Sequence, residues 1–454
     1  MISFTTTAVA EQLQASCLGP EVRFSSVSTD TRSIAAGDLF VALQGPNFDA
    51  HDFIGQAQAS GAAAAMVSRE SSAPISQVVV PDTSIGLGRL AALWRQESSA
   101  PLVAVTGSNG KTTVKEMLAA ILSLEGSVLS TQGNLNNDIG LPLTLMGLQD
   151  HDYAVVEMGA NHGGEIGYLS NIARPDVAVL INAGRAHLEG FGSLEGVARA
   201  KGEIITGLDD DGWFVFNADD AWAPLWRELA GTRSIRTFGV QQEADVFSPE
   251  DAWHLDWSDS GFSSRFQVIT PEGEVEIELA MAGLHNRMNA LASIAAAQLL
   301  GISLDQIKRG LASLAPVKGR LQPLVGQSGV ALIDDSYNAN PDSVTAAIDV
   351  LATAPGRRFL VLGELAEMGE DGEALYRELG EYARQAGIEC LYATAEAAPA
   401  VASFGQGGRV FESRELLSSA LLQELNPGDR VLVKGSRKAA MEHVINLLLE
   451  GETV

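Results

Sequence analysis

The sequence predicts an α/β protein of three domains, in which a central parallel-sheet domain with a P-loop is flanked by a small αβ N-terminal domain and a Rossmann-like C-terminal domain. From residue 101 onward, near-continuous apolar runs alternate with helical stretches, a pattern typical of a parallel sheet covered by helices. Residues 101–116 read as an apolar strand, a Gly-rich turn and the start of a helix. A chain of 454 residues has room for roughly two to four such units.

The first predicted domain, residues 1–82, is a compact αβ unit. A connecting helix over 84–97 is expected to lead from it into the second domain. The elements predicted in this unit are a helix at 5–15, a strand at 38–43 and a helix within 51–61 that leads to residues 62–67. The segment 78–83 is expected to end the unit.

The second predicted domain, residues 83–314, contains apolar runs that are each followed by a polar residue: Gly107, Glu157, Asn182 and Asn217. Open α/β sheets bind ligands at the carboxyl ends of their strands, so this edge is the expected binding site. The predicted elements are strands at 102–105, 154–156, 177–181 and 213–216, appended antiparallel strands within 241–280, and a long Ala-rich helix at 285–300.

The third predicted domain, residues 315–454, alternates strands and helices again, with glycines at the joins. Its predicted strands lie at 330–333, 359–362, 390–393 and 431–433, and its predicted helices at 343–352, 372–385 and 438–449.

The composition excludes several classes of partner. With 30 Lys+Arg against 57 Asp+Glu the net charge is −27, which disfavours nucleic acid and anionic membranes. Cys17 and Cys390 match no metal or redox spacing and fit free thiols in a reducing cytosol. The N-terminus lacks a basic region, and the apolar runs are too short to span a bilayer. We expect a soluble cytoplasmic protein.

The turn at residues 107–113 has the chemistry of a phosphate-binding loop. Glycines let backbone N–H groups approach phosphate oxygens, and the helix N-terminus adds positive charge. Lys111 supplies a cation for the outer phosphates, and the Thr112 hydroxyl suits Mg²⁺. Only two residues separate Gly107 from Gly110, whereas the common loop has four between its glycines. The pattern predicts a nucleoside triphosphate and leaves the reaction open.

Several polar residues near these strand ends suit a metal site. Glu157 ends an apolar strand, where a carboxylate ligates Mg²⁺ directly or through water. His187 follows the next strand and suits a second metal, the orientation of a carboxylate, or an ordinary polar contact. Lys201 lies on a predicted helix and, from the sequence alone, is best explained as a solvated lysine.

The remaining candidates lie at the start of the Ala-rich helix and near the start of the third domain. Asn286 and Asn289 suit either a base edge or a helix cap. Arg320 suits either the γ-phosphate across a domain junction or a hinge. Residues 334–343 are densely polar, which suits an amine or peptide site, and Asp342 or Ser343 is the expected helix cap.

No protein nucleophile is apparent in the sequence. Neither cysteine has a suitable neighbourhood, and there is no Ser-His-Asp set. Lys111, Glu157, His187 and Arg320 instead suit phosphoryl transfer, in which positioning and charge neutralisation do most of the work.

These residues together resemble the Mur ligases, the ATP-dependent amide-forming enzymes that build the peptide of bacterial peptidoglycan. The segment TGSNGKTT is similar to that family's own shortened phosphate loop. Residues 338–342 lack the arginine of the Asp-Asn-Pro-Arg stretch in the relative that adds the third amino acid, which favours the dipeptide-adding member. The resemblance runs from Asp30 to Glu442 and is carried by residues 28–54, 182–193, 334–343 and 433–444.

The resemblance implies a role for each matching residue. The catalytic residues would be Lys111, Lys201, His187 and Arg320. ATP would be bound by Gly107, Ser108, Asn109, Gly110, Lys111, Thr112 and Thr113, with Asn286 at the adenine, Arg320 at the phosphates and Asp335 at the ribose. Two Mg²⁺ ions would be held by Thr112, Glu157, His187 and a carbamylated Lys201. The substrates would be bound by Asp30, Thr31, Arg32 and Gly45 in the first domain, Asn134 and Asn137 in the second, and Asn338, Asn340 and Ser343 in the third.

The resemblance also implies a reaction. ATP would phosphorylate the carboxylate of UDP-N-acetylmuramoyl-tripeptide, and D-alanyl-D-alanine would attack the acyl phosphate, giving an amide, ADP and phosphate. The first domain would bind the UDP-sugar, and the third would bind the dipeptide and close the ATP site. We expect a monomer without nucleic acid or membrane partners.

Three alternatives stay open at this point. One is the ligase that adds the third amino acid, and another is an amide ligase similar to folylpolyglutamate synthase, which begins nearer its phosphate loop. A different class is a binding module that uses ATP as a conformational switch. The polar stretch at 334–343 and the metal candidates disfavour the switch, because a switch needs no amine site.

Overall fold

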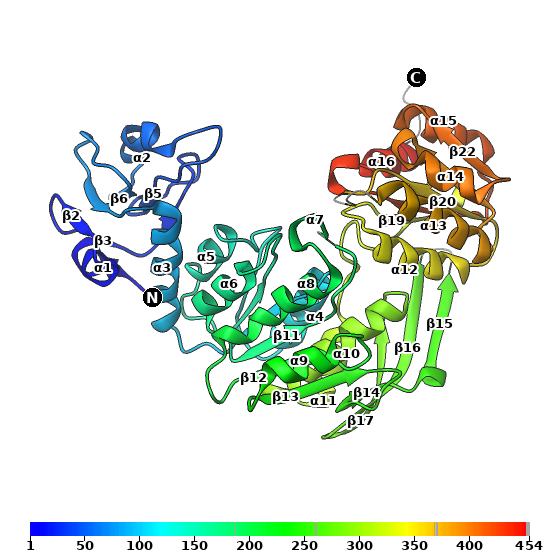
Figure 1. Cartoon of the computed structure of the whole chain (residues 1–454), viewed down its shortest axis with the longest axis horizontal. Coiled ribbons are helices and arrows are strands. Elements are labelled where there is room, and N and C mark those ends of the chain that lie inside the picture. Colours follow the sequence, from blue (N-terminus) through cyan, green and yellow to red (C-terminus); the bar gives the residue numbers. More distant parts are fainter. Residues whose placement is uncertain (187, 259–260, 367, 369–370, 451–454) are drawn as a thin grey trace.

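The computed structural model describes residues 1–186, 188–258, 261–366, 368 and 371–450. They form sheets of two, five, ten and six strands, connected by helices. Figure 1 shows the N-terminal and C-terminal units at opposite ends of the molecule, with the ten-stranded sheet between them. The predicted α/β class with a central parallel sheet is confirmed.

The N-terminal unit is built on the five-stranded sheet, in the order β2-β7-β6-β5-β4. The helix α3 (Thr83–Gln96) leads out of it, and Asp82 caps α3 by accepting from the backbone N–H groups of Ser84 and Ile85. The buried Trp94 on α3 donates its indole N–H to the carbonyl of Leu148 at 2.8 Å, which anchors the unit to the centre. The other elements are β1 (Phe4–Thr5), α1 (Thr6–Leu13), β2 (Ser16–Leu18), β3 (Arg23–Phe24), β4 (Val27–Ser28), β5 (Leu39–Val41), α2 (Ile54–Ala59), β6 (Ala64–Val67) and β7 (Ser76–Val79).

The ten-stranded sheet forms the centre of the molecule. Strands β8 to β14 pair in parallel in the order β14-β13-β12-β11-β8-β10-β9, and β15, β16 and β17 extend the sheet antiparallel. The antiparallel addition predicted for 241–280 is therefore confirmed. The strands are β8 (Leu102–Thr106), β9 (Val128–Ser130), β10 (Tyr153–Glu157), β11 (Val177–Leu180), β12 (Trp213–Asn217), β13 (Ser234–Gly239), β14 (Val246–Phe247), β15 (Trp253–Ser258), β16 (Gly261–Thr270) and β17 (Gly273–Leu279).

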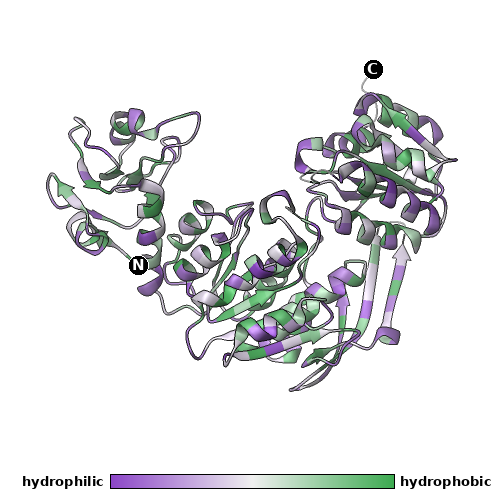
Figure 2. Ribbon diagram, viewed as in Figure 1, coloured by the Kyte–Doolittle hydropathy of each residue, from purple (hydrophilic) through white to green (hydrophobic). Residues whose placement is uncertain are grey.

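Two hydrophobic cores cover the two faces of this sheet. On β8, Leu102 and Ala104 point into one core while Val103 and Val105 point into the other, and all four are fully buried. Burial on both faces explains why the strand reads as a continuous apolar run. Figure 2 shows mainly hydrophobic strands inside and hydrophilic stretches on the outer helices. One face is covered by α5 (Gly140–Leu145), α6 (Glu165–Ala173), α8 (Leu194–Gly202) and α9 (Ala223–Ala230), the other by α4 (Lys111–Leu122), α10 (Leu284–Leu299) and α11 (Leu304–Ala312).

The order of the central strands puts β8 at a switch point. The chain passes from β8 through α4 to β9, returns to β10 beside β8, and then continues on the other side with β11. Ligands bind at the carboxyl ends of strands where the order reverses in this way. The residues after β8, β10 and β11 are therefore brought to one crevice edge.

The C-terminal sheet has the order β18-β19-β23-β20-β21-β22, parallel except for β18. Two differences from the predicted helices have local causes. Ala440 adopts a left-handed φ of 48°, so the helix expected over 438–449 is a short 3₁₀ turn followed by α16. Asn340, rather than Asp342 or Ser343, caps α12, and Ser343 completes a capping box with it.

The elements of this unit are β18 (Gln322–Val325), β19 (Ala331–Asp335), α12 (Pro341–Ala352), β20 (Arg358–Leu362), α13 (Gly372–Gln385), β21 (Cys390–Thr394), α14 (Ala398–Phe404), β22 (Gly408–Phe411), α15 (Arg414–Glu424), β23 (Arg430–Lys434) and α16 (Glu442–Glu450). The hairpin formed by β15 and β16 reaches this unit from the central sheet (Figure 1). Phe262 and Ala282 belong to its core, and Trp257 donates its indole N–H to the Thr353 hydroxyl at 3.2 Å. The two sheets thus share buried side chains.

Within the described residues, no helix is both long enough and apolar enough to cross a membrane.

We predict that Gly310→Ala destabilises the central unit. A Cβ on Gly310 in α11 would lie 2.5 Å from the Cα of Ile121 in α4, so one helix must move. The expected loss is about 1–3 kcal/mol of unfolding free energy, measured by urea unfolding followed by tryptophan fluorescence. The control is Gly167→Ala on α6, whose Cβ would make only ordinary contacts, and its effect should be neutral or stabilising by up to about 1 kcal/mol.

Candidate functional site

The phosphate-loop candidate lies between β8 and α4, as the sequence predicts. Gly110 has a φ of 88°, and a Cβ there would lie 2.3 Å from Oδ1 of Asn289, so only glycine fits. The backbone N–H of Asn109 donates to Oδ1 of Asn182 at 2.9 Å, and Nδ2 of Asn182 donates back to the Asn109 carbonyl at 3.1 Å. Asn182, two residues beyond the end of β11, therefore braces the loop against the neighbouring strand.

The first residues of α4 collect charged side chains from three parts of the chain. The Thr112 hydroxyl donates to Oε2 of Glu157 at 2.9 Å and accepts from Nη2 of Arg320 at 3.0 Å. Nζ of Lys111 donates to the Gly107 carbonyl at 2.9 Å, which folds the side chain over the loop. Burial lowers the pKa of Lys111; the negative charge of Glu157 opposes this shift, and the positive charge of Arg320 adds to it.

Glu157 is buried and fixed by its neighbours. Its backbone N–H donates to the Thr131 hydroxyl at 2.9 Å, and its Oε1 accepts from Nδ2 of Asn136 at 2.8 Å. The sequence prediction named Asn134 and Asn137 in this loop. Both are exposed, and it is Asn136, which the sequence analysis missed, that contacts Glu157.

Lys201 lies on α8 and is only 2% exposed, which contradicts a solvated lysine. Among the described residues no hydrogen bond or ion pair reaches its ammonium, and the Phe191 ring lies 5.8 Å away. Burial lowers the pKa of Lys201 well below its usual range, and the positive charge of Lys111 lowers it further. Burial therefore favours the neutral form of this amine.

The metal candidates are incomplete in the described part of the chain. His187 lies outside the described residues, and no group of three His, Cys, Asp or Glu side chains suited to a metal occurs among the others. Thr112 and Glu157 nevertheless fit Mg²⁺ in chemical type, because a hydroxyl and a buried carboxylate supply hard oxygens.

Arg320 is positioned by a strained turn at the start of the C-terminal unit. Gly319 and Leu321 both have positive φ values, 70° and 45°, which is unusual for leucine. Oδ1 of Asp335 accepts from the Leu321 backbone N–H at 3.1 Å, and its Oδ2 accepts from Nζ of Lys434 at 2.6 Å. The guanidinium of Arg320 then lies 4.5 Å from the centre of the Tyr337 ring, facing Thr112.

The stretch at 334–343 meets the phosphate loop directly. Nδ2 of Asn340 donates to Oδ1 of Asn109 at 2.8 Å, while Oδ1 of Asn340 accepts from the backbone N–H of Ser343. Asn338 is exposed, and its carbonyl accepts from Nζ of Lys434 at 3.1 Å. The structure therefore brings two of the three predicted dipeptide residues to the loop edge.

The predicted adenine residue, Asn286, lies in the first turn of α10. Its Nδ2 donates to the Ala282 carbonyl at 2.9 Å, and its Oδ1 accepts from Nδ2 of Asn289 at 3.2 Å. Gly283 is the residue that caps α10, so Asn286 is not a cap. It links the helix start to Asn289, which packs on the phosphate loop.

The first-domain candidates lie in a separate unit from the phosphate loop (Figure 1). Arg32 forms an ion pair with Asp30 at 2.6 Å, and this pairing lowers the pKa of Asp30 to about 2. The backbone N–H of Gly45 donates to the Phe48 carbonyl at 2.9 Å and shapes the neighbouring turn, and Thr31 is partly exposed between Asp30 and Arg32. These residues lie at a partly exposed edge of the unit.

The site has a Gly-rich loop between a buried strand and a helix, and a carboxylate and an arginine both contact the first threonine after the loop. These features define a P-loop enzyme, here built from three α/β units. Family models match it in three segments: "Mur ligase family, catalytic domain" at residues 23–94, "Mur ligase middle domain" at 105–297, and "Mur ligase, glutamate ligase domain" at 319–437. The chain belongs to the Mur ligase family and is an ATP-dependent ligase.

Known relatives match the chain from end to end. The UDP-N-acetylmuramoyl-tripeptide–D-alanyl-D-alanine ligase of Escherichia coli (strain K12) is 44% identical, with 100% of both chains covered. MurF from Acinetobacter baumannii has a TM-score of 0.92 at 37% identity, with 99% of each chain covered. The MurF ligase from Thermotoga maritima, solved in complex with ADP, has a TM-score of 0.84 at 30% identity, with 93% of this chain and 96% of that chain covered.

We predict that His285 makes the stability of the protein depend on pH. Burial lowers the pKa of His285 to about 4 from 6.5, with the positive charge of Lys434 adding to the shift and Asp349 opposing it. Because the unfolded chain binds the proton more readily, stability should be fully present above pH 6.5 and fall as the pH drops toward 4.

Thermal unfolding at pH 7.5 and 4.5 would measure this dependence. His285→Gln should reduce the difference between the two melting temperatures, whereas His254→Gln on the exposed side of β15 should leave it unchanged. An equal difference in the wild type and His285→Gln would contradict the prediction.

Proposed function

We propose that this ligase joins D-alanyl-D-alanine to UDP-N-acetylmuramoyl-tripeptide through an acyl phosphate, giving the UDP-muramoyl-pentapeptide precursor of peptidoglycan. The observation that carries the proposal is the junction at Thr112, where Glu157 and Arg320 meet on the first threonine of the phosphate loop. End-to-end similarity to ligases named for this reaction supports the substrates. The chain carries Asp342 where the relative adding the third residue has an arginine, so that alternative has less support.

The first step transfers the γ-phosphoryl group of ATP to the terminal carboxylate of the tripeptide. Two anions must meet in this step, so positive charge near the transferred group is the main requirement. Lys111 and Arg320, both beside Thr112, would supply it. The loop residues from Gly107 to Thr113 would hold the phosphates, and Asn286 would lie near the adenine. Asp335 would contact the ribose region or would act indirectly, by holding the turn that positions Arg320.

The second step needs the amine of the dipeptide at the carbonyl carbon of the acyl phosphate. Asn338, Asn340 and Ser343 would form this side of the site, since their stretch meets the phosphate loop through Asn109. The nucleotide-sugar would lie along the partly exposed edge of the N-terminal unit, near Asp30, Thr31, Arg32 and Gly45, with Asn134 and Asn137 facing its peptide.

Two Mg²⁺ ions would be held by Thr112, Glu157, His187 and a carbamylated Lys201, and would supply charge neutralisation at the phosphates. Carbamylation requires an unprotonated amine, and the burial that lowers the pKa of Lys201 favours that form. Because every residue in these roles comes from one chain, we propose a monomer, acting in the cytoplasm where its nucleotide substrates are made.

A phosphate-release assay tests the reaction. Wild-type protein should consume ATP only when tripeptide and dipeptide are both present. Lys111→Ala should lower the rate at least about a hundredfold, because the phosphates lose a preorganised cation. Lys308→Ala, which removes an exposed lysine on α11, is the matched control. ATP consumption without either substrate would contradict the proposed reaction, and near-normal turnover of Lys111→Ala would contradict the assigned loop.

The carbamate is tested by chemical rescue. Lys201→Ala should lose most activity and regain part of it in acetate or propionate, since a short carboxylate can occupy the space of the missing anion. Lys111→Ala assayed in the same acids is the control and should stay inactive. No rescue at any concentration would count against the carbamate and leave the ligation reaction standing.

A further inference from the structure

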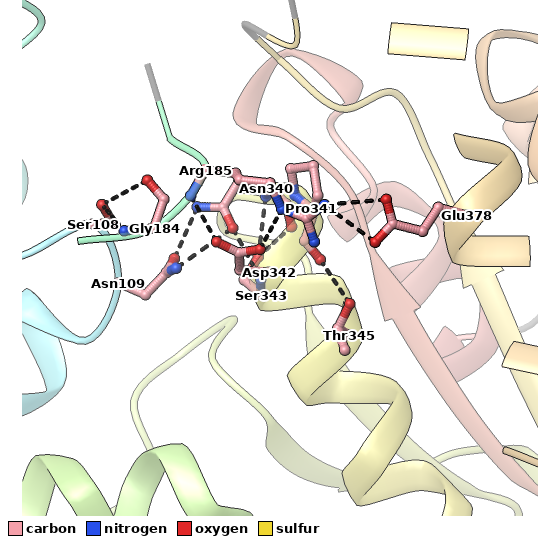
Figure 3. Close-up of polar contacts among 10 residues, drawn as sticks. All are labelled: Ser108, Asn109, Gly184, Arg185, Asn340, Pro341, Asp342, Ser343, Thr345 and Glu378. Carbon is pink, nitrogen blue, oxygen red and sulfur yellow. Dashed lines mark hydrogen bonds and ion pairs between the residues drawn. The ribbon is translucent and has the colours of Figure 1, made fainter. Parts of the chain in front are cut away.

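The phosphate loop and the start of α12 are joined by several polar contacts (Figure 3). The backbone N–H of Arg185 donates to Oδ2 of Asp342 at 2.6 Å, and its Nε donates to Oδ1 at 2.7 Å. The same guanidinium reaches Glu378 on α13 at 3.1 Å. Arg185 follows β11 in the central unit, so this ion pair crosses between the two units.

Two further contacts run beside this ion pair. The Gly184 backbone N–H donates to the Ser108 hydroxyl at 2.9 Å, which ties the Arg185 segment to the phosphate loop. The amide of Asn340 caps α12 with its oxygen and donates to Asn109 with its nitrogen. One side chain thus fixes both the helix start and its distance from the loop.

Gly184 leaves the space in which the Asp342 carboxylate sits. A Cβ at Gly184 would lie 2.5 Å from Oδ2 of Asp342, while its φ is not in the left-handed region. Replacing Gly184 by alanine would therefore displace the end of the Asp342 side chain and leave the backbone unstrained. The close approach of a carboxylate at this glycine is a specific feature of the junction.

We propose that Asp342 and Asn340 are positioning residues that hold the start of α12 against the phosphate loop, through Arg185 and Asn109, so that an amine and not water meets the acyl phosphate. This inference rests on the proposed function and deepens it. Asp342 and Asn340 set the placement of the amine side of the site relative to the phosphates. Arg185 and Asp342 are each about one-third exposed, which leaves their charge-assisted bonds only partly screened.

The chemistry explains why placement matters. In productive turnover the amine nitrogen bonds to the acyl carbon, the bond from that carbon to the phosphate oxygen breaks, and phosphate and a proton leave. If water attacks the same carbon, the tripeptide carboxylate and phosphate are returned and no amide forms. ATP is then hydrolysed without ligation, so loss of placement appears as phosphate released in excess of amide.

The test compares phosphate release with amide formation in Asp342→Ala and Gly184→Ala. Both variants should release clearly more than one phosphate per amide, and kcat/KM for the dipeptide should fall about tenfold, as expected for the loss of a charge-assisted hydrogen bond. KM for ATP should change little. Asp349→Ala removes a carboxylate from the same helix away from the junction and should keep the ratio at one. Asn340→Ser keeps a helix cap but cannot reach Asn109, and should raise the ratio as well.

The outcomes separate this inference from the proposed function. A wild type that releases no phosphate with both substrates overturns the reaction itself. The positioning role is overturned if the wild type releases one phosphate per amide and the variants lose phosphate release and amide formation in the same proportion. Melting temperatures within a few degrees of wild type exclude unfolding as the cause, and Asp342→Glu should restore part of the coupling.

Discussion

The hydroxyl of Thr112 is the contact on which the arrangement of this protein depends. It has one proton to donate, which goes to Glu157, and a lone pair that accepts from Arg320. The three residues come from the start of α4, the end of β10 and the first turn of the C-terminal unit. A hydroxyl can donate one hydrogen bond and accept another at the same time. The phosphate loop, the proposed metal-binding carboxylate and the C-terminal unit are therefore held together at this one side chain.

The chain is acidic as a whole, but positive charge gathers at the phosphate loop. The chain carries 57 acidic against 30 basic side chains, yet cations are concentrated at the loop edge. Lys434 is almost completely buried there, and Lys111 and Arg320 lie beside Thr112. An acidic surface keeps non-specific polyanions away, while local cations in a poorly hydrated site attract phosphates strongly. Selectivity for a small anionic ligand follows from this combination.

Most of the fold could be predicted from the sequence because its strands are apolar on both faces. The run at β8 predicts burial without any tertiary information, and the Gly-rich turn after it predicts the loop. The burial of Lys201 could not be predicted, because a lysine on a helix is normally solvated. In the structure its ammonium is buried 5.8 Å from the centre of the Phe191 ring in α7 (Leu188–Phe191). Lys201 became a candidate site residue only through the resemblance to the Mur ligases.

The misplaced helix starts also have a physical explanation. Asp342 and Ser343 both suit a cap, and the pattern cannot tell which of three neighbouring polar residues faces the helix axis. In the structure Asn340 takes that place, which frees Asp342 for Arg185, 157 positions earlier in the chain. Contacts of this kind depend on how two units pack against each other, and this packing cannot be predicted from the local sequence.

The hairpin of β15 and β16 gives the molecule a mechanical property. Phe262 completes the hydrophobic core of the C-terminal unit although the ribbon that carries it belongs to the central sheet. Any rotation of that unit must therefore either withdraw an aromatic side chain into water or twist the two-stranded ribbon. Since a narrow ribbon twists more readily than a buried ring is exposed, the ribbon would act as a torsion element that stores work as the unit turns and returns it afterwards.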